Sequence, residues 1–291
     1  MKSRTSDPRG SSSAAHAVTA SDSVGRAESE RLHKLREVEL HEHLAPEYVR
    51  RYKPAFSSLF QRYWNDELLA STQPVSGRVL DCGCGTGVML STLASHFESV
   101  HAVDLSPDML RLAARRETPG ARLCAIVLAD AELLPYEDEY FDSVVCRGSL
   151  HHMPNLDAVL CELRRVLRPG GRLVVSEPCN DSWLVRTARR CLYVLSNRFE
   201  EADEGYSSDE FNRCIRSAGF RILESRRFGY LAYALAGFPD IVPILKVLPF
   251  ARGLTSVLIR VDRVIERVPG LAGMGFHIMV TAERDENCGD S

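Results

Sequence analysis

The chain has nine cysteines but no C-x-x-C pair, and an odd number of cysteines cannot all pair within one chain. The sequence therefore indicates neither a disulfide framework nor a structural zinc site, and its cysteine usage is typical of a reducing cytoplasm. Lysine is scarce as well, because nearly all of the 36 basic residues are arginine. With a formal net charge of -3, the chain offers no broad electrostatic attraction for nucleic acid.

Long apolar runs are also missing. The longest uninterrupted apolar stretch covers residues 228–239, which is too short to cross a bilayer, and the N-terminus has no apolar signal segment. We therefore expect a cytoplasmic protein without a transmembrane segment. Residues 1–28 contain almost no large apolar side chains, so we expect a disordered tail there. The rest of the 291 residues is compatible with one elaborated domain.

Residues 78–87 are typical of a strand that runs straight into a glycine-rich turn and then a helix. Gly83, Gly85 and Gly87 lack the Cβ atoms that keep a ligand away from the backbone. The apolar run that follows ends in Asp104, where a second parallel strand would place a carboxylate beside a ribose diol. The pattern predicts a cofactor that contains a nucleoside.

The spacing of the glycines argues against a dinucleotide or a nucleoside triphosphate. A G-x-G-x-x-G fingerprint requires a third glycine at position 88 or 90, and these positions are Val88 and Leu90. No Lys-Ser or Lys-Thr pair follows the glycines, so a phosphate-binding P-loop is excluded too. Asp81, just before the turn, would repel a pyrophosphate but attract an amine. The methionine ammonium of S-adenosylmethionine suits this position.

Several motifs in register are similar to those of class I S-adenosylmethionine-dependent methyltransferases. Residues 79–87 resemble the first motif of that family, residues 104–110 the second and residues 129–135 the third. Residues 141–146 and 163–175 resemble the fourth strand and then the helix, turn and fifth strand. The resemblance is close over residues 75–180, and five motifs in the same order make it specific.

The resemblance implies the roles of individual residues in a cofactor site. Asp104 would accept from the ribose hydroxyls, Leu105 would pack on the adenine, and Asp130 would accept from the adenine amino group. One tyrosine among Tyr48, Tyr52 and Tyr63 would close over the methionine end, or these aromatics simply pack on the sheet. The predicted cofactor-binding residues are Asp81, Gly83, Cys84, Gly85, Gly87, Asp104, Leu105, Met109, Asp130, Ala131, Arg147 and Tyr52.

The alternation of strands and helices predicts an α/β fold, a Rossmann-like doubly wound sheet of seven strands that is mostly parallel with an antiparallel last strand. We expect strands at 78–82, 99–104, 123–128, 142–147, 171–177, 220–225 and 275–282. Crossover helices are expected at 86–96, 107–116 and 157–167, with a short one after Ala131. The segments are a tail (1–28), a helical cap (29–74), the cofactor-binding core (75–180), helices and the sixth strand (181–227), an apolar insertion (228–274), and the last strand with its tail (275–291).

The insertion is too long for a tight connection between two strands. We interpret it as a helical lid that supplies an apolar substrate pocket. Three other interpretations compete: a packed accessory subdomain, an interface between copies of the chain, and a surface that dips into a membrane. The predicted pocket residues are Tyr206, Tyr230, Tyr233 and Phe238.

The chemistry of methyl transfer requires positioning, dry surroundings and, for acidic acceptors, loss of a proton. His151 and His152 are candidates for a general base, although a similar Leu-His-His run serves the cofactor pocket or the loop in many enzymes that the chain resembles. Methylation of an alkene is an alternative in which aromatic rings stabilise a carbocation. The sequence has no carboxylate cluster for a metal beyond the cofactor acids.

The resemblance thus implies a methyltransferase with S-adenosylmethionine as cofactor. The sequence favours a lipophilic small molecule, such as a secondary metabolite, as the acceptor of the methyl group. A membrane lipid or quinone is the first alternative, and a cofactor-binding scaffold without catalysis is the second. Nucleic acid is not an expected partner, whereas a homo-oligomer and peripheral membrane contact are compatible with the sequence.

Overall fold

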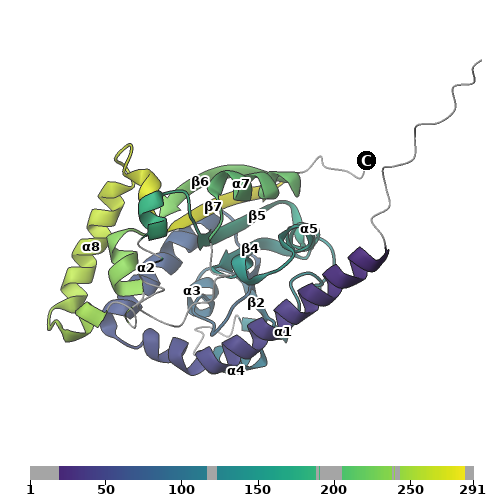
Figure 1. Cartoon of the computed structure of the whole chain (residues 1–291), viewed down its shortest axis with the longest axis horizontal. Helices are drawn as coiled ribbons and strands as arrows, with labels where there is room; N and C mark the ends of the chain where they lie inside the picture. The colour runs from purple at the N-terminus through teal and green to yellow at the C-terminus, as the bar shows by residue number, and fades with distance from the viewer. Residues whose placement is uncertain are drawn as a thin grey trace, which may run out of the picture.

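A computed structural model describes residues 20–116, 123–187, 190, 205–237, 239 and 243–285. A seven-stranded sheet in the order β3-β2-β1-β4-β5-β7-β6 forms the centre of the molecule (Figure 1). The predicted doubly wound α/β fold is therefore confirmed. The strands are β1 (Arg78–Cys82), β2 (Ser99–Asp104), β3 (Leu123–Leu128), β4 (Phe141–Arg147), β5 (Leu167–Pro178), β6 (Phe220–Phe228) and β7 (His277–Arg284).

The strand pairing also follows the prediction. β7 lies antiparallel between β5 and β6, and the four pairings among β1 to β5 are parallel. Parallel strands bring their carboxyl ends to one edge of the sheet, which is where ligands bind in such folds. The bounds of β1, β2 and β3 agree with the expected ones. β5 starts four residues earlier than expected, at Leu167, because its first residues already extend beside Phe141 of β4.

Helices cover both faces of the sheet. The helices are α1 (Ala20–Arg51), α2 (Ala55–Thr72), α3 (Leu90–Ala94), α4 (Pro107–Ala113), α5 (Leu156–Val166), α7 (Ser208–Ser217) and α8 (Ala251–Ile265). One buried apolar cluster joins α2, α3 and α8 to one face, and a second joins α5 and α7 to the other. Among the described helices, none combines the length and apolarity needed to cross a membrane.

Two expectations about the helices were wrong. The helix expected after Ala131 does not form, and residues 131–140 make turns instead. Pro135 has no N–H to donate, and the N–H of Leu134 bonds to the Glu162 carboxylate at 2.7 Å rather than to a preceding carbonyl. α3 begins at Leu90 rather than at residue 86, because the turn continues through Gly87, whose N–H donates to the Cys84 carbonyl.

The N-terminal cap consists of two helices. α1 begins at Ala20, inside the segment that we expected to be a disordered tail, and runs beside α4 (Figure 1). Alanine, glutamate and arginine recur between residues 26 and 36, and these residues have high helix propensity. α2 lies in the interior, and its side chains Phe60 and Leu68 are fully buried against the sheet.

The predicted lid (228–274) is built from short pieces and one long helix. A π-helical turn η4 (Tyr233–Gly237), two 3-10 turns η5 (Pro243–Val247) and η6 (Ala272–Met274), and α8 make up its described part. α8 packs along α2 with Thr255 and Ile259 buried between them, at the left edge of Figure 1.

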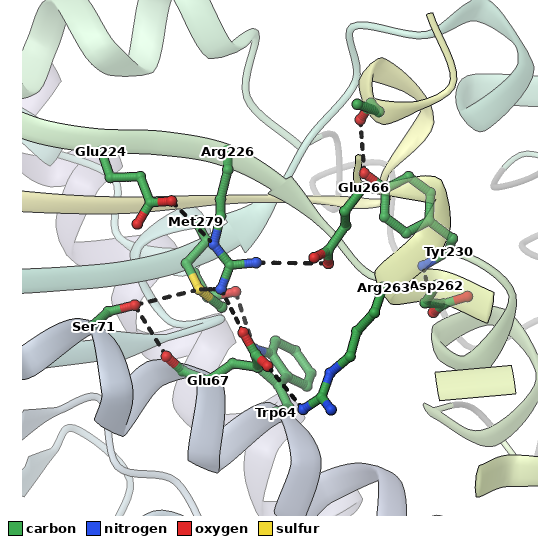
Figure 2. A network of polar contacts seen from close by, with 12 residues as sticks. Trp64, Glu67, Ser71, Glu224, Arg226, Tyr230, Asp262, Arg263, Glu266 and Met279 are labelled. Atoms are coloured by element: carbon green, nitrogen blue, oxygen red, sulfur yellow. Dashed lines mark hydrogen bonds and ion pairs between the residues drawn. The ribbon is translucent and has the colours of Figure 1, made fainter. Parts of the chain in front are cut away.

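Polar contacts fix the lid to the rest of the fold. Figure 2 shows Arg226 of β6 and Arg263 of α8 converging on Glu67 of α2, with N···O distances of 2.8 and 3.3 Å. Asp262 of α8 is buried and accepts hydrogen bonds from the N–H groups of residues 230, 231 and 232, just before η4. A carboxylate in this position satisfies amides that have no partner within the turn. α8 and η4 are therefore joined as one unit.

Candidate active site

The glycine-rich turn after β1 has all three glycines in the left-handed region, with φ of +71° at Gly83, +51° at Gly85 and +74° at Gly87. A Cβ at Gly83 would lie 2.4 Å from Cβ of Ser149, and one at Gly87 would lie 3.1 Å from Cα of Ala113. Only at Gly85 would a Cβ meet nothing within 4 Å. Gly83 and Gly87 therefore make room for other parts of the protein, and Gly85 faces open space; that the three glycines also let a ligand approach the backbone stays a prediction.

This difference predicts opposite behaviour for two matched variants. Gly83→Ala combines a strained backbone with a clash against Ser149, so its free energy of unfolding should fall by about 3 kcal/mol or more. Gly85→Ala adds only the backbone strain, about 1 to 2 kcal/mol, but places a methyl group where the ligand would approach. Urea unfolding and calorimetric titration with S-adenosylmethionine measure the two effects. Equal stability losses in the two variants would contradict the assignment.

Asp81, at the end of β1, is a buried acid without its full set of partners. Its side chain is 1% exposed, and its Oδ2 atom has no hydrogen-bond partner in the described part of the chain. Burial, with a smaller contribution from the charge of Asp104, raises its pKa to about 7 against the opposing charge of Arg147. Burying an ionised carboxylate is costly unless a cation pairs with it. The site is therefore matched to a ligand that brings a positive charge, as the methionine ammonium of S-adenosylmethionine does.

Asp104, at the end of β2, is held by the turn that follows β1. Its Oδ2 atom accepts from the N–H of Gly85 at 2.8 Å, and its Oδ1 atom accepts from the N–H of Ser106 at 2.9 Å. These bonds fix the carboxylate beside the one glycine that faces open space. A carboxylate so placed can still accept from ribose hydroxyls, because each oxygen has a second lone pair.

Asp130, after β3, has a partner that sequence reasoning missed. Lys34 of α1 donates to Oδ2 of Asp130 at 2.7 Å and lies 2.8 Å from the carboxylate of Glu132. Burial lowers the pKa of Lys34, but the hydrogen bonds to the two acids outweigh it, so the pKa is raised overall. Lys34 and Asp130 are 96 residues apart in the chain, and no local pattern links them.

A cavity lies where these strand ends meet α1. It brings together six of the predicted residues, and Lys34 and Glu37 of α1 also line it. The other predicted cofactor-binding residues are not in its wall, and two of them are buried elsewhere: Cys84 packs in the core and Met109 lies in the first turn of α4. The six predicted residues in its wall are Gly83, Asp104, Leu105, Asp130, Ala131 and His152.

Arg147 defines the side of the site next to Asp81. Burial lowers the pKa of this guanidinium to about 10, while Tyr52 and Asp81 act in the opposite direction. Its guanidinium carbon lies 4.1 Å from the centre of the Trp64 ring, and it donates to the side-chain oxygen of Gln61. Tyr52 acts on Arg147 electrostatically and raises its pKa. Both can serve the methionine end of the cofactor.

The loop after β4 is organised by Glu177 of β5, a residue that sequence reasoning missed. Its Oε1 atom accepts from the N–H groups of Ser149 and Leu150, each at 2.9 Å, and its Oε2 atom lies 2.7 Å from Nδ1 of His151. Glu177 itself is fully buried. If Nδ1 of His151 donates this bond, the neutral ring keeps its lone pair on Nε2.

The two histidines, which the sequence could not separate, have different surroundings. His151 is held by Glu177, whereas His152 lines the cavity and its Nδ1 atom lies 3.1 Å from Glu37 of α1. Their ring centroids are 3.9 Å apart. His151 has the arrangement of a base whose orientation is fixed by a buried acid, and His152 belongs to the wall of the cavity.

A series of side-chain contacts connects Arg147, through Trp64, to the lid. The Trp64 indole donates to Ser176 at 3.1 Å, and Ser176 lies 3.3 Å from Nδ1 of His277. Nε2 of His277 lies 2.6 Å from the hydroxyl of Tyr233, and all four side chains are buried. Of these, only Tyr233 was predicted as a site residue.

The predicted pocket tyrosines do not gather in one place. The hydroxyl of Tyr206 donates to the Leu150 carbonyl at 3.0 Å, and that of Tyr230 donates to the Ala272 carbonyl at 2.8 Å. Tyr206 packs with the cluster on the α5 side of the sheet, and Tyr233 with the cluster on the α2 side. Phe238 lies outside the described residues. The structure thus brings Tyr233 alone close to Arg147.

Comparison with known proteins points in the same direction as this geometry. A family model described as a methyltransferase domain matches residues 80–175. The ubiquinone/menaquinone biosynthesis C-methyltransferase UbiE of Bordetella avium is 39% identical over 103 residues, which are 34% of this chain and only 40% of that relative. A malonyl-[acyl-carrier protein] O-methyltransferase of Methylococcus capsulatus is 38% identical over 235 residues, covering 73% of this chain and 80% of the relative.

The fold also matches solved structures. An S-adenosylmethionine-dependent methyltransferase from Thermotoga maritima superposes with a TM-score of 0.56 at 19% identity, over 85% of this chain and 99% of that one. At this identity the likeness shows the fold alone. The relative from Methylococcus capsulatus shares sequence over most of its length, and the buried acid Asp81 and open Gly85 fit the cofactor. The chain belongs to the S-adenosylmethionine-dependent methyltransferases, and S-adenosylmethionine is its cofactor.

Proposed function

We propose that the chain transfers the methyl group of S-adenosylmethionine to a hydrophobic small molecule. The observation that carries the proposal is the buried aromatic cluster next to Arg147, which makes the surroundings of that guanidinium apolar. Trp64 lies 5.7 Å from Tyr233 and 4.7 Å from His277 in centroid distance, and Phe60 lies 6.0 Å from Tyr233. Aromatic and apolar surfaces with few polar groups are typical of sites that bind apolar ligands.

The chain's own residues support the methyl transfer in three ways. When bound, S-adenosylmethionine supplies an electrophilic methyl group on a sulfonium. Asp81 and Arg147 would orient its charged end, and the buried aromatic cluster next to Arg147 would keep water away from that side. His151, oriented by Glu177, is the group we propose to accept a proton from an acidic acceptor.

Quinone methylation is the first form of this proposal. The Bordetella avium relative is named as a ubiquinone/menaquinone C-methyltransferase, and a ring of that kind would be lipophilic enough for these apolar surroundings. In a quinol acceptor, loss of a phenolic proton to a base makes the adjacent ring carbon nucleophilic. The methyl group then leaves sulfur for carbon, and the ring proton is released to restore aromaticity.

Methylation of a carboxylate is a second candidate, favoured by Arg147. A buried guanidinium can hold a carboxylate through two parallel hydrogen bonds. The Methylococcus capsulatus relative is named as an O-methyltransferase of a malonyl group on acyl-carrier protein, and a malonyl group ends in a carboxylate. An acceptor of this kind is already ionised at neutral pH and needs no general base.

An assay with labelled cofactor separates these candidates. The full chain is incubated with S-adenosylmethionine labelled in its methyl group and with either a prenylated naphthoquinol or malonyl-acyl-carrier protein. We expect label in an apolar product that organic solvent extracts from the quinol reaction. A methyl ester would instead release labelled methanol in alkali, whereas a C-methyl product would retain its label.

Two matched variants control this assay. Asp81→Asn should strongly lower turnover with either acceptor when the cofactor is subsaturating, whereas Asp209→Asn, at an exposed position in the first turn of α7, should leave turnover unchanged. If label is transferred only to malonyl-acyl-carrier protein, the acceptor is the carboxylate and not the quinol. Tight cofactor binding without transfer to either acceptor would overturn the proposal of a hydrophobic acceptor.

A further inference from the structure

The outward face of α8 carries a stripe of exposed apolar residues. Val257, Val261, Val264 and Val268 are 50%, 37%, 61% and 38% exposed, and they recur every three or four residues. This spacing places Val257, Val261 and Val264 on one side of the helix, opposite the buried residues that pack on α2, and Val268 follows in the turn just beyond it. The inner apolar face of α8 is covered by α2, whereas the outer apolar face is exposed. Exposed apolar patches of this kind mark sites of contact with another molecule.

The stripe extends beyond the helix to its N-terminal end. Phe250, directly before α8, is 62% exposed, and Val247 at the end of η5 is 78% exposed. Ile244, in the first turn of η5, is 54% exposed. The described part of the chain does not cover these large apolar side chains. We name these seven residues the outer face of α8.

Among the described residues 243–268, the exposed charged side chains are basic. Lys246, Arg252, Arg260 and Arg267 are exposed on η5, on α8 and just beyond it. The acids of the same segment turn inward: Asp262 is buried against backbone amides, and Glu266 lies 3.6 Å from Arg226 (Figure 2). The outer face of α8 is therefore basic, although the whole chain has a formal net charge of -3.

We propose that the outer face of α8 docks on a lipid bilayer that contains anionic phospholipids. An interfacial helix combines an apolar side that enters the headgroup region with arginines that reach phosphate groups, and this face has both. A second copy of the chain is a poorer occupant. A two-fold contact through this face would bring the arginines of one copy against those of the other, with no exposed acid of α8 to pair with them.

Docking in this way would position the active site relative to the bilayer. Asp262 of α8 holds the backbone before η4, and η4 carries Tyr233, which is part of the series of side-chain contacts to Arg147. An apolar molecule dissolved in a membrane would therefore meet the lid first. The docking proposal itself does not depend on the acceptor, because it rests on exposed residues far from the methyl-donor residues in the chain.

Binding to vesicles tests the proposal without cofactor or acceptor. The full chain is mixed with phosphatidylcholine vesicles that contain about 30% phosphatidylglycerol, or none, and bound protein is separated by flotation. We expect the partition coefficient to be at least about tenfold higher with phosphatidylglycerol, and to fall as salt is raised. Val257→Ser combined with Val264→Ser, and separately Arg260→Gln combined with Arg267→Gln, should each lower it by about tenfold.

Matched variants elsewhere keep the test specific. Arg213→Gln combined with Arg216→Gln removes two exposed arginines from α7 and should leave vesicle binding unchanged. Unaltered heat of S-adenosylmethionine binding shows that each variant is folded. Failure to bind anionic vesicles, or equal binding to both kinds, would overturn the proposal. A dimer in sedimentation that the valine variant abolishes would assign the face to a second copy instead. Neither result would bear on the acceptor assay.

Discussion

Asp81→Asn is expected to weaken S-adenosylmethionine binding by about 100-fold and, at the same time, to stabilise the ligand-free protein at pH 8. The first effect follows because an amide cannot neutralise the methionine ammonium, and a hydrogen bond between charged groups contributes about 1.5 to 3 kcal/mol. The second follows because Asp81 is buried and its Oδ2 atom lacks a partner within the described residues. Ionising a buried carboxylate without a partner costs free energy, and a neutral amide of the same shape removes this cost.

The pH dependence of this stability gain has a definite sign. The pKa of Asp81 rises from 3.8 in the unfolded reference to about 7 in the folded protein. The folded state therefore resists ionisation, and the cost is absent below about pH 4, grows between pH 4 and 7, and is complete above pH 7. At 1.36 kcal/mol per pKa unit, the full cost is up to about 4 kcal/mol. Wild type and variant should thus converge in stability near pH 4 and diverge toward pH 8.

Urea unfolding at several pH values and calorimetric titration measure the two effects. Asp104→Asn is the matched control, because Asp104 already accepts from two backbone N–H groups and an amide would turn a donor toward one of them. This control should lose cofactor affinity and stability together. In the wild type, affinity should rise by up to about tenfold per pH unit from pH 5.5 toward 7 as Asp81 ionises. A variant that is less stable than the wild type at pH 8 would contradict this account of Asp81.

The features that the sequence predicted well are those that a few neighbouring residues determine. Asp81 and Asp104 each follow a short apolar run and precede a turn, so their position at strand ends could be read from neighbouring residues. The glycine turn was recognisable for the same reason. The roles of the individual glycines could not be predicted in this way. A Cβ at Gly83 would clash with Ser149, which lies in the loop after β4 and is distant in the sequence.

The residues that were missed act across long stretches of chain. Lys34 reaches Asp130 only because α1 folds back over the ends of β2 and β3, and its own surroundings in the sequence give no sign of this. His277 and Trp64 meet through Ser176 across three elements. Glu177 ends a strand, as the predicted acids do, and that position was the one signal that could have identified it.

Glu177→Ala is expected to cause the largest loss of stability, about 3 to 5 kcal/mol, because it leaves the buried N–H groups of Ser149 and Leu150 without an acceptor. Glu177→Gln keeps one oxygen for those two N–H groups but turns a donor toward His151. It should therefore cost less stability than the alanine variant, and methyl transfer should still fall by about 100-fold if His151 must be held in one orientation. Unfolding in urea and kcat/KM measure these two quantities.

His151→Asn separates the two roles of Glu177. It removes the imidazole that Glu177 orients, while the bonds from the carboxylate to Ser149 and Leu150 remain. If Glu177 acts chiefly as the anchor of the loop, this variant should be nearly as stable as the wild type, and hydrogen exchange at those two amides should stay slow. A general base at His151 further requires that acidic acceptors lose turnover in both His151→Asn and Glu177→Gln. Equal activity of wild type and His151→Asn would leave Glu177 as a structural residue and remove His151 from the chemistry.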